Sequence, residues 1–467
     1  MTDFDVVVIG GGLSGLSAAL RLALFGYRVC LVEQQPRLGG MNTYFERDGK
    51  TIETALHALT NWPGGNGPAS PWRLILRQLR LPSAEFPLAP QAFSQIRLGG
   101  TFLNFGNDFR LFLEEAKRFP AGDQVGLFVD RSLLPYSLWA CPAGFGSARK
   151  VLLEWLGNSP LLPMIYLPVA AFGAATEGDM PFGVFSMLFR AIFAEGLCRP
   201  VGGIKALLTL LHRQLERYGA FLLLRQRVAA IRTAGDQVLA VTLQNGESIT
   251  ARQFVSTIGW PETWALLQDN AGTARQSQSP PAGRISFLEV IAELSCPPAE
   301  LGFRPSMLFY CLKDECDFRA PSELIEPRLG AVCAPGNFQY PDPASEPMAK
   351  TMRLTCLAAY DQWASLPAGQ YQTEKMKAAE KLLTTLASLG WDIRPAIVNI
   401  EVTTPLTLAR YTGRSQGAVY GSPHKLWDGK TPFANLFLAG TDQGLPGVVG
   451  ALLSGIIVVN QHLLPKA

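Results

Sequence analysis

The first forty residues hold the pattern most able to bind a reactive cofactor. An apolar, β-branched run at 5–9 leads into the turn GGGLSG at 10–15, which has the spacing G-x-G-x-x-G. Helical spacing follows at 16–25, and a second apolar run at 28–32 ends on Glu33. A strand, a glycine turn, a helix, a second strand and an acid in this order are typical of a dinucleotide-binding βαβ unit.

Each part of this unit has a chemical task. Gly10 permits the tight turn, Gly12 lets a pyrophosphate approach the backbone, and Gly15 lets helix and strand pack closely. The helix N-terminus offers unpaired N–H groups and the positive end of its dipole to the phosphates. The carboxylate of Glu33 can accept hydrogen bonds from ribose hydroxyls.

Two later segments have the patterns needed to complete a cofactor domain. A PVGG turn at 200–203 precedes a predicted helix at 204–218, and 435–440 is predicted to be a strand that leads through a turn to an apolar helix at 448–464. Short strands are predicted between them, at 221–224, 227–233, 238–243, 248–252 and 254–257. The cofactor domain is therefore expected to be discontinuous in sequence.

The segments between these pieces predict a second domain. Strand-like runs occur at 285–294, 307–312 and 352–359, and a helix is predicted at 370–388. These elements predict an antiparallel sheet with helical cover, which would form the floor of a substrate site.

Size and composition limit the classes of protein. The chain has 467 residues, of which 48% are hydrophobic and 17% charged, with a mean hydropathy of +0.14 and a net charge of +3. This length accommodates two domains with sizeable cores. No basic stripe with interleaved aromatic residues is present, so nucleic acid is not an expected partner.

Cysteine and histidine usage predicts no metal centre. The chain has eight cysteines, none in a C-x-x-C motif, and four histidines, so we expect no zinc or iron–sulfur site. Scattered buried thiols in a reducing compartment are expected. Asp3 and Asp5 precede the first apolar run, which has no basic flank, so the run is interpreted as a strand rather than a signal peptide and a cytoplasmic location is expected.

Beyond Glu33, the pair Gly39-Gly40 resembles the FAD-binding signature of the amine oxidase and phytoene desaturase superfamily. The chain as a whole resembles the phytoene desaturase, carotenoid isomerase and retinol saturase group of that superfamily. The residues that carry this resemblance are 10–15, Glu33, Gly39-Gly40, His57, 200–203, 404–407, 417–421 and 439–455.

The resemblance implies an α/β fold, with a Rossmann-like FAD-binding domain and an α+β substrate domain that has an antiparallel sheet and helical cover. We expect residues 1–60, 200–274 and 401–467 in the first domain and 61–199 and 275–400 in the second. FAD is expected to bind non-covalently, and the main chain of Val228 matches the position that meets the adenine. The predicted cofactor-binding residues are Gly10, Gly12, Leu13, Ser14, Gly15, Glu33, Gly39, Gly40, Met41, Asn42, Val228, Gly440, Asp442, Gly447, Val448 and Val449.

Several positions depart from the family pattern. Met41 stands where Arg or Asn is common, and Glu53-Thr54-Ala55 stands where Asp-x-Gly is common. The final turn, GLPG at 444–447, resembles the hydroxysqualene dehydroxylase branch rather than the usual Pro-Gly-x-Gly. For Asp442, a cofactor contact and a turn or N-cap role are both open.

The resemblance implies an FAD-dependent oxidoreductase that acts on a lipophilic isoprenoid or polyene. Hydride transfer between a C–H or C=C unit and flavin N5 requires little from the protein beyond a dry, shaped slot. His57 resembles a histidine of the isomerase and saturase branch, so it is the candidate proton donor or substrate-orienting group; a purely structural role is the alternative. Desaturation, saturation and isomerisation all remain open, as does the external electron acceptor.

Two other functions and one partner remain open from the sequence. A flavin amine oxidase shares the fold, and a non-enzymatic lipid-binding relative would keep the fold without needing the intact glycines and Glu33. The apolar segment 156–193 is either a peripheral membrane contact or a helical cover over the substrate site.

Overall fold

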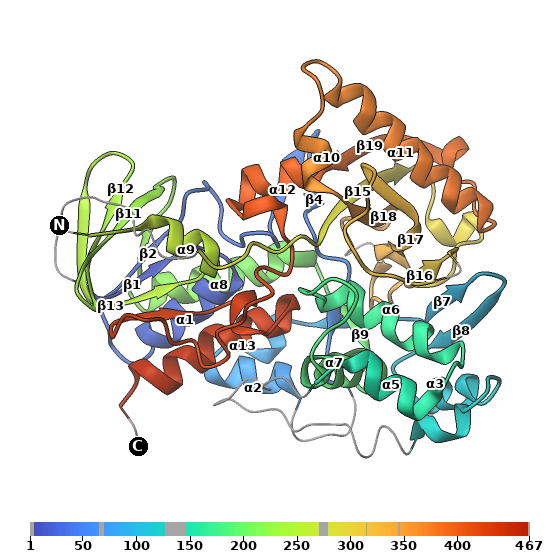
Figure 1. Cartoon of the computed structure of the whole chain (residues 1–467), viewed down its shortest axis with the longest axis horizontal. Coiled ribbons are helices and arrows are strands. Elements are labelled where there is room, and N and C mark those ends of the chain that lie inside the picture. Colours follow the sequence, from blue (N-terminus) through green and yellow to red (C-terminus); the bar gives the residue numbers. More distant parts are fainter. Residues whose placement is uncertain are drawn as a thin grey trace.

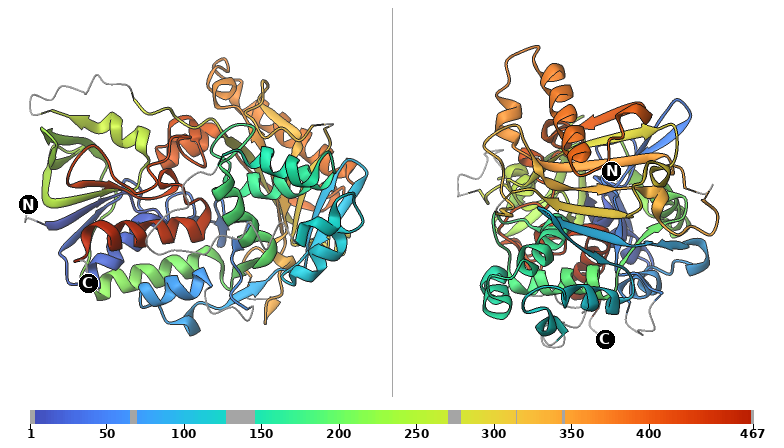
Figure 2. Two further views of the ribbon diagram at one scale, coloured as in Figure 1. Left: turned by 60° about the horizontal axis from the view of Figure 1, so that its bottom comes forward. Right: turned by 90° about the vertical axis from the view of Figure 1, so that its right-hand side faces the viewer.

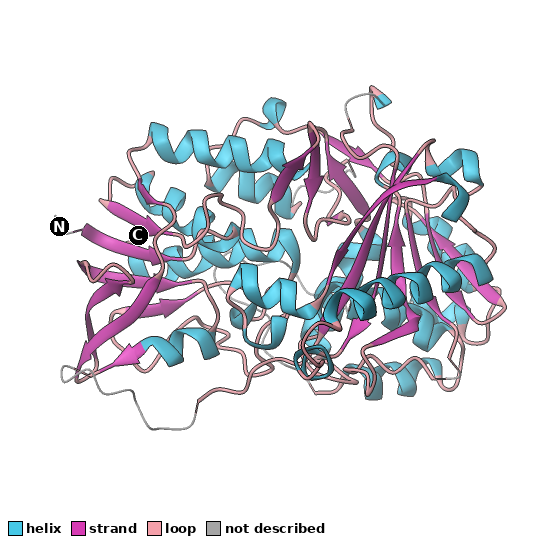
Figure 3. Ribbon diagram, turned by 90° about the horizontal axis from the view of Figure 1, so that it is seen from above, coloured by secondary structure: helices cyan, strands magenta, loops and turns pink. Residues whose placement is uncertain are grey.

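The computed structural model describes residues 4–64, 70–126, 146–269, 279–313, 315–343 and 346–465. They form two lobes, each built on a β-sheet, and the two sheets lie side by side (Figures 1 and 3). Both ends of the chain lie in the lobe that contains the N-terminal strand (Figure 1).

The first sheet is assembled from three distant parts of the chain. Its parallel strands run in the order β10-β2-β1-β13-β20, and β12, β11 and β14 continue it beyond β13. β1 and β2 are almost entirely buried, as expected for β-branched strands covered on both faces. The strand bounds are β1 Phe4–Ile9, β2 Val29–Val32, β10 Phe221–Leu223, β11 Val228–Ala234, β12 Gln237–Leu243, β13 Ser248–Ser256, β14 Leu267–Gln268 and β20 Leu436–Leu438.

Three helices from the same three parts pack together beside this sheet: α1 (Leu13–Ala23), α8 (Gly203–Arg217) and α13 (Gly447–Val458). Small residues allow the close approach of α1 and α13. A Cβ added at Gly455 would lie 2.2 Å from the carbonyl oxygen of Ser14. A Cβ at Gly15 would lie 1.9 Å from the carbonyl oxygen of Gly10. Gly15 therefore allows the helix to pack against the turn that follows β1.

The second sheet has seven strands in the order β19-β15-β18-β17-β16-β7-β8 and is antiparallel except for the β16–β7 pair. One face packs against α11 (Tyr371–Ser388) through residues such as Leu288 and Leu354. The other face turns toward α6 (Leu161–Gly173) and α7 (Phe182–Phe189). Figure 2 shows these helices on opposite sides of the sheet. The strand bounds are β7 Ser94–Leu98, β8 Thr101–Phe105, β15 Ser286–Leu294, β16 Met307–Cys311, β17 Ile325–Cys333, β18 Thr351–Ala358 and β19 Ile397–Thr403.

Smaller elements join the two lobes. A hairpin of β3 and β4 projects beside the junction, and β5, β9 and β6 form a short sheet. Their bounds are β3 Tyr44–Arg47, β4 Lys50–Glu53, β5 Leu59–Thr60, β6 Leu88–Pro90 and β9 Leu197–Pro200. The remaining α-helices among the described residues are α2 Pro71–Gln78, α3 Phe109–Ala116, α5 Ala148–Leu156, α9 Trp260–Leu266, α10 Tyr360–Ala364 and α12 Pro405–Thr412.

Several predicted boundaries differ from the structure: the helix predicted at 16–25 is α1 (Leu13–Ala23), and the strand predicted at 435–440 is β20 (Leu436–Leu438). The segments 248–252 and 254–257 form one strand, β13, because the pairing with β1 continues through Gln253. The C-terminal helix predicted over 448–464 ends as α13 at Val458 and continues as a π-helical turn over Val459–Leu463. Local sequence patterns do not contain the long-range pairing that fixes such boundaries.

We propose that the two sheets mark the two expected domains. The first sheet uses strands from each of the three expected FAD-domain pieces. At the expected boundary between 400 and 401, the structure has the continuous strand β19, which pairs with β15 of the second sheet. The proposed boundary therefore moves to the end of this strand.

Segment 156–193 contributes α6 and α7, and its apolar side chains lie in the interior. Met164, Phe185 and Phe189 are at most 1% exposed and belong to one core cluster with the second sheet. Among the described residues, no helix combines the length and the apolar character needed to cross a membrane.

The expectation of scattered free thiols is wrong for one pair. Cys311 at the end of β16 forms a disulfide with Cys316. Cys30, Cys198, Cys333 and Cys356 are free and buried, Cys296 is free and partly exposed, and Cys141 lies outside the described residues. A separation of five positions carries no pairing signal by itself, so the sequence did not reveal this bond.

Candidate active site

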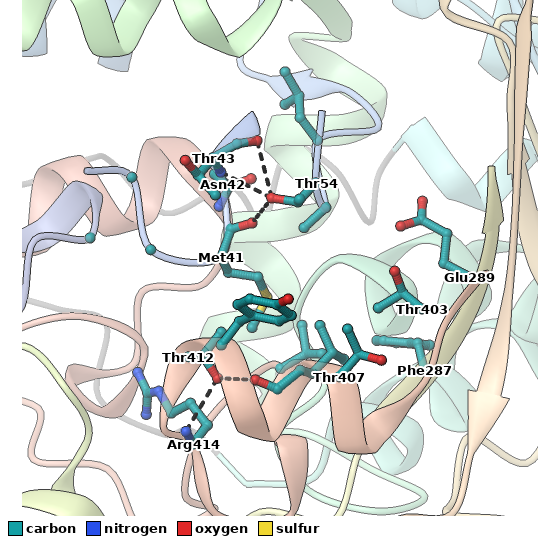
Figure 4. Close-up of a pocket in the computed structure, with 18 of the residues that line it drawn as sticks. Met41, Asn42, Thr43, Thr54, Phe287, Glu289, Thr403, Thr407, Thr412 and Arg414 are labelled. Atoms are coloured by element: carbon teal, nitrogen blue, oxygen red, sulfur yellow. Dashed lines mark hydrogen bonds between the residues drawn. The ribbon is translucent and has the colours of Figure 1, made fainter. Parts of the chain in front are cut away.

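One cavity of about 1180 Å³ connects the two lobes. Its first half is lined by the turn before α1, by residues that follow β2 and by the segment around Met41. Its second half is lined by β15 to β19 and by α6 and α12. Figure 4 shows Met41 and Asn42 on one side of this space and Phe287, Glu289 and Thr403 on the strand side.

Most of the predicted site residues line this cavity. They are Gly10, Gly12, Leu13, Ser14, Glu33, Gly39, Gly40, Met41, Asn42, His57, Val228, Gly440, Gly447 and Val448. Gly15, Asp442 and Val449 do not line it. The cavity therefore brings together residues from all three distant segments that the sequence predicted.

The glycines around the cavity differ in the space beside them. A Cβ added at Gly12 would meet only the Cα atom of Gly40, at 3.9 Å, and a Cβ at Gly447 would meet nothing within 4 Å. Gly10 has φ +100°, a backbone conformation that favours glycine. The backbone at Gly12 and Gly447 is thus open to a ligand, whereas Gly10 and Gly15 serve the turn itself.

Glu33 is buried at the end of β2 and is fixed by the turn it faces. Its Oε2 accepts a hydrogen bond from the backbone N–H of Gly11 at 2.6 Å, and its Oε1 accepts one from that of Gln35 at 2.7 Å. Burial raises the pKa of Glu33, while these backbone hydrogen bonds act against the rise. Each oxygen keeps a second lone pair that can accept a ribose hydroxyl.

Asp442 lies outside the cavity and joins several distant segments. Its carboxylate accepts hydrogen bonds from the backbone N–H groups of Trp260 at 2.6 Å and Ser422 at 2.8 Å. Arg414 lies 3.4 Å and Lys425 3.6 Å from it. Burial lowers the pKa of Lys425 to about 8, against the opposing effect of Asp442. Of the two roles left open for Asp442, the turn-stabilising role fits these contacts.

His57 lies beside the second sheet with oxygen atoms at both ring nitrogens. Its Nε2 is 2.9 Å from Thr355 Oγ1 and 3.0 Å from Glu289 Oε1, and its Nδ1 is 3.2 Å from the carbonyl oxygen of Ala55. Arg353 donates from Nε to the same Glu289 oxygen at 2.8 Å. Burial acts to raise the pKa of Glu289, but Arg353 and His57 hold it at about 2.

A second buried ion pair holds the strand that leads to His57. Glu53, at the end of β4, accepts a hydrogen bond from Nη2 of Arg199 at 2.5 Å and also binds the backbone N–H of Ile204. Both charged side chains are at most 1% exposed. Burial acts to lower the pKa of Arg199, but Glu53 and Glu346 raise it well above its ordinary value. Glu53, which departs from the family Asp, thus connects β4 to α8.

The second half of the cavity changes from polar to apolar across the sheet. Thr355, Glu289 and Thr403 are paired in register on β18, β15 and β19 and form a polar row. Beyond this row the wall is hydrocarbon and aromatic, and we call that region the apolar arm. It consists of Leu167, Ala171, Phe172, Phe287, Met307, Phe309, Phe318, Leu329, Ala331 and Leu357.

Sequence reasoning missed several residues of this site. Arg37 and Thr257 line the cofactor half, and Glu289, Thr355 and Thr403 line the other half. A signal for Glu289 was present, because a carboxylate inside the apolar run 285–294 requires a partner when buried. The partner Arg353 likewise interrupts the apolar run at 352–359.

Comparison with known proteins identifies the family. Residues 13–462 match the family described as flavin containing amine oxidoreductase. The chain belongs to this family. As a flavin-containing oxidoreductase it uses FAD as its cofactor, and the open backbone at Gly12, the acceptor Glu33 and the N-terminus of α1 fit a bound dinucleotide.

Curated relatives support the same group of the family. The all-trans-retinol 13,14-reductase of Rattus norvegicus is 23% identical over 99% of this flavin-containing oxidoreductase and 86% of its own length. Prolycopene isomerase 1 of an Oncidium hybrid cultivar is 22% identical over 98% of this chain and 84% of its own length. The resemblance to carotenoid isomerases and retinol saturases is thus confirmed.

Solved structures confirm the fold class. An oxidoreductase from Methanosarcina mazei matches with a TM-score of 0.67 at 17% identity and covers 98% of this flavin-containing oxidoreductase and 100% of its own chain. At this identity the likeness concerns the fold alone. A Rossmann-like FAD-binding domain joined to an α+β substrate domain is the architecture that the sequence predicts.

Proposed function

We propose that this FAD-dependent oxidoreductase acts on a lipophilic isoprenoid or polyene, at a C–H or C=C unit. The observation that carries the proposal is the apolar arm, which lies beyond the polar row in the same cavity as the cofactor half. Phe172, Phe287, Phe309 and Phe318 line this arm, and their flat hydrocarbon surfaces suit an extended conjugated chain. The names of the curated relatives favour the same substrate class.

The protein contributes positioning and the exclusion of water. When bound, FAD supplies the redox chemistry, because its ring exchanges a hydride with a carbon atom of the substrate. The sheet and α6 enclose the apolar arm, which keeps the reacting carbon away from water. We propose that His57, held by Thr355 and Glu289, holds or delivers a proton at Nε2.

The buried packing of 156–193 favours one of the two roles considered for it. Leu167, Ala171 and Phe172 of α6 line the cavity, and the rest of the helix is packed in the core. We propose that α6 covers the substrate site rather than contacting a membrane. We also propose that the protein functions in the cytoplasm, where it meets its lipid substrate and an external electron acceptor.

The proposal is tested by the spectrum and lipid content of the purified protein. We expect a non-covalent flavin of FAD mass in the acid supernatant and an isoprenoid or polyene in the organic extract. Anaerobic mixing of the reduced or oxidised enzyme with that lipid should change the visible absorbance of the flavin, because hydride transfer changes the redox state of its ring. If simple amines reduce the flavin and no polyene does, the amine oxidase alternative replaces the proposal.

A further inference from the structure

The strand side of the cavity contains two polar oxygens that no described residue satisfies. The side-chain nitrogens of Arg353 and His57 both contact Oε1 of Glu289. The other carboxylate oxygen, Oε2, has no hydrogen-bond partner among the described residues. Thr403 Oγ1, on the neighbouring strand, likewise makes no hydrogen bond to any described residue. Both side chains line the cavity, and Figure 4 shows them together on its strand side.

The two oxygens are neighbours by register. Glu289 on β15 pairs directly with Thr403 on β19, so their side chains leave the same face of the sheet side by side. The next cavity-facing residue along β15 is Phe287, which begins the apolar arm. A molecule lying along the arm would therefore end at a carboxylate oxygen and a hydroxyl.

We infer that the substrate carries a terminal hydroxyl, so that the cavity takes a polyene or isoprenoid alcohol rather than a pure hydrocarbon. The substrate O–H donates to Glu289 Oε2, and the Thr403 hydroxyl donates to the substrate oxygen. A hydrocarbon end in the same place would leave this buried carboxylate oxygen without a donor at the start of the apolar arm. This inference rests on the proposed function and narrows it to one substrate class.

The charge of the site favours a neutral hydroxyl over an ammonium group. The carboxylate of Glu289 already faces the guanidinium of Arg353, 2.8 Å from Nε, and His57 at 3.0 Å. Its negative charge is therefore compensated inside the protein, and no further cation is needed. What remains at Oε2 is an acceptor position, which one O–H group satisfies.

Three probes of equal chain length separate the two hydrogen bonds. All-trans-retinol can donate and accept, its methyl ether can only accept, and the corresponding deoxy hydrocarbon can do neither. Each is titrated into the FAD-loaded enzyme, and binding is followed by the flavin absorbance change. We expect retinol to bind about 10- to 100-fold more tightly than the hydrocarbon, as one charge-assisted hydrogen bond allows, with the ether between them.

Two variants assign the steps of this series to residues. Glu289→Gln should reduce the preference for alcohol over ether, and Thr403→Val should reduce the preference for ether over hydrocarbon, each by about 5- to 10-fold. Thr403→Ser keeps the hydroxyl and should bind all three probes as the parent does. If Glu289→Gln fails to fold, Thr403→Val and the parent series still test the inference.

The outcomes distinguish this inference from the proposed function. Equal binding of all three probes overturns the hydroxyl assignment and leaves a polyene oxidoreductase. Tighter binding of the matching primary amine than of retinol also overturns it, in favour of an amine substrate. Failure of every polyene to bind or to perturb the flavin overturns the proposed function itself.

Discussion

Arg199 and Arg353 donate to the same carbonyl oxygen, that of Leu56, at 3.1 Å and 2.6 Å. Arg199 comes from β9 and Arg353 from β18, and both are fully buried. Arg199 also donates to the carbonyl oxygen of His57 at 2.8 Å. The backbone that presents His57 to the cavity is thus fixed between two cations from different parts of the chain.

The first prediction concerns the ion pair of Arg199 and Glu53. Arg199→Met should lower the free energy of unfolding by about 3–5 kcal/mol, because it leaves the Glu53 carboxylate buried without its cation. Denaturant unfolding of the FAD-loaded protein measures this loss. Arg110→Met, which removes an exposed pair with Asp108, should change stability little.

A double variant tests the reason for this loss. Arg199→Met combined with Glu53→Met removes both charges, so it should lose less than Arg199→Met alone. An equal or larger loss in the double variant would mean that packing or the buried Glu346 carboxylate, 3.6 Å from Arg199, sets the cost rather than Glu53.

The second prediction is an acid-sensitive contribution from Glu289. Its pKa is lowered from 4.5 to about 2 in the folded protein, so the folded state binds fewer protons than the unfolded chain in this range. The contribution, about 3 kcal/mol, is complete above pH about 4.5 and is lost as the pH falls toward about 2. Unfolding free energies measured from pH 6 to about pH 3 should fall more steeply for the parent than for Glu289→Gln.

A surface carboxylate provides the control for this pH series. Glu216 is 64% exposed, and Glu216→Gln should leave the pH slope of the parent unchanged. Parallel slopes for the parent and Glu289→Gln would show that the ion pair with Arg353 does not lower the proton affinity of Glu289.

The cofactor half of the site was predictable because its signals are local. The glycine turn at 10–15 and the acid Glu33 lie within one βαβ unit, and buried β-branched runs mark its strands. Their spacing in sequence fixes their spacing in space.

The substrate half was less predictable because it depends on sheet register. Glu289, Thr355 and Thr403 become neighbours only through the order β19-β15-β18, in which strands far apart in the chain pair. The alternation of apolar and polar residues reveals which residues share a face of a strand, but not which strand lies beside it. For the same reason the sequence located Asp442 in its turn and missed its contacts with Trp260 and Ser422.

The third prediction concerns backbone strain at the cavity wall. Ala55 has φ +52°, and it stands where the family commonly has glycine. The left-handed conformation destabilises a folded non-glycine residue by about 1–2 kcal/mol. Replacing alanine by glycine removes this strain but costs about 0.4–1 kcal/mol of stability, because glycine gives the unfolded chain more conformational entropy. Ala55→Gly should therefore stabilise the protein by about 0.5–1 kcal/mol.

Denaturant unfolding of Ala55→Gly, compared with Ala229→Gly, tests this balance. Ala229 is an exposed residue of β11 without a left-handed backbone, so its replacement by glycine should destabilise the protein. Destabilisation by Ala55→Gly would indicate that the methyl group contributes packing that outweighs the strain.

The fourth prediction separates two glycines that sequence reasoning treats alike. A Cβ at Gly12 has 3.9 Å of clearance to the Cα atom of Gly40, whereas one at Gly15 would lie 1.9 Å from the carbonyl oxygen of Gly10. Gly12→Val should therefore fold but lose FAD, because its side chain fills the space that a pyrophosphate needs. Gly15→Ala should instead destabilise the apoprotein, because the turn and the helix can no longer pack.

Two measurements separate these effects. The flavin content after purification reports the loss of FAD, and denaturant unfolding of the flavin-free proteins reports the loss of stability. A Gly12→Val protein with full FAD content would place the pyrophosphate elsewhere.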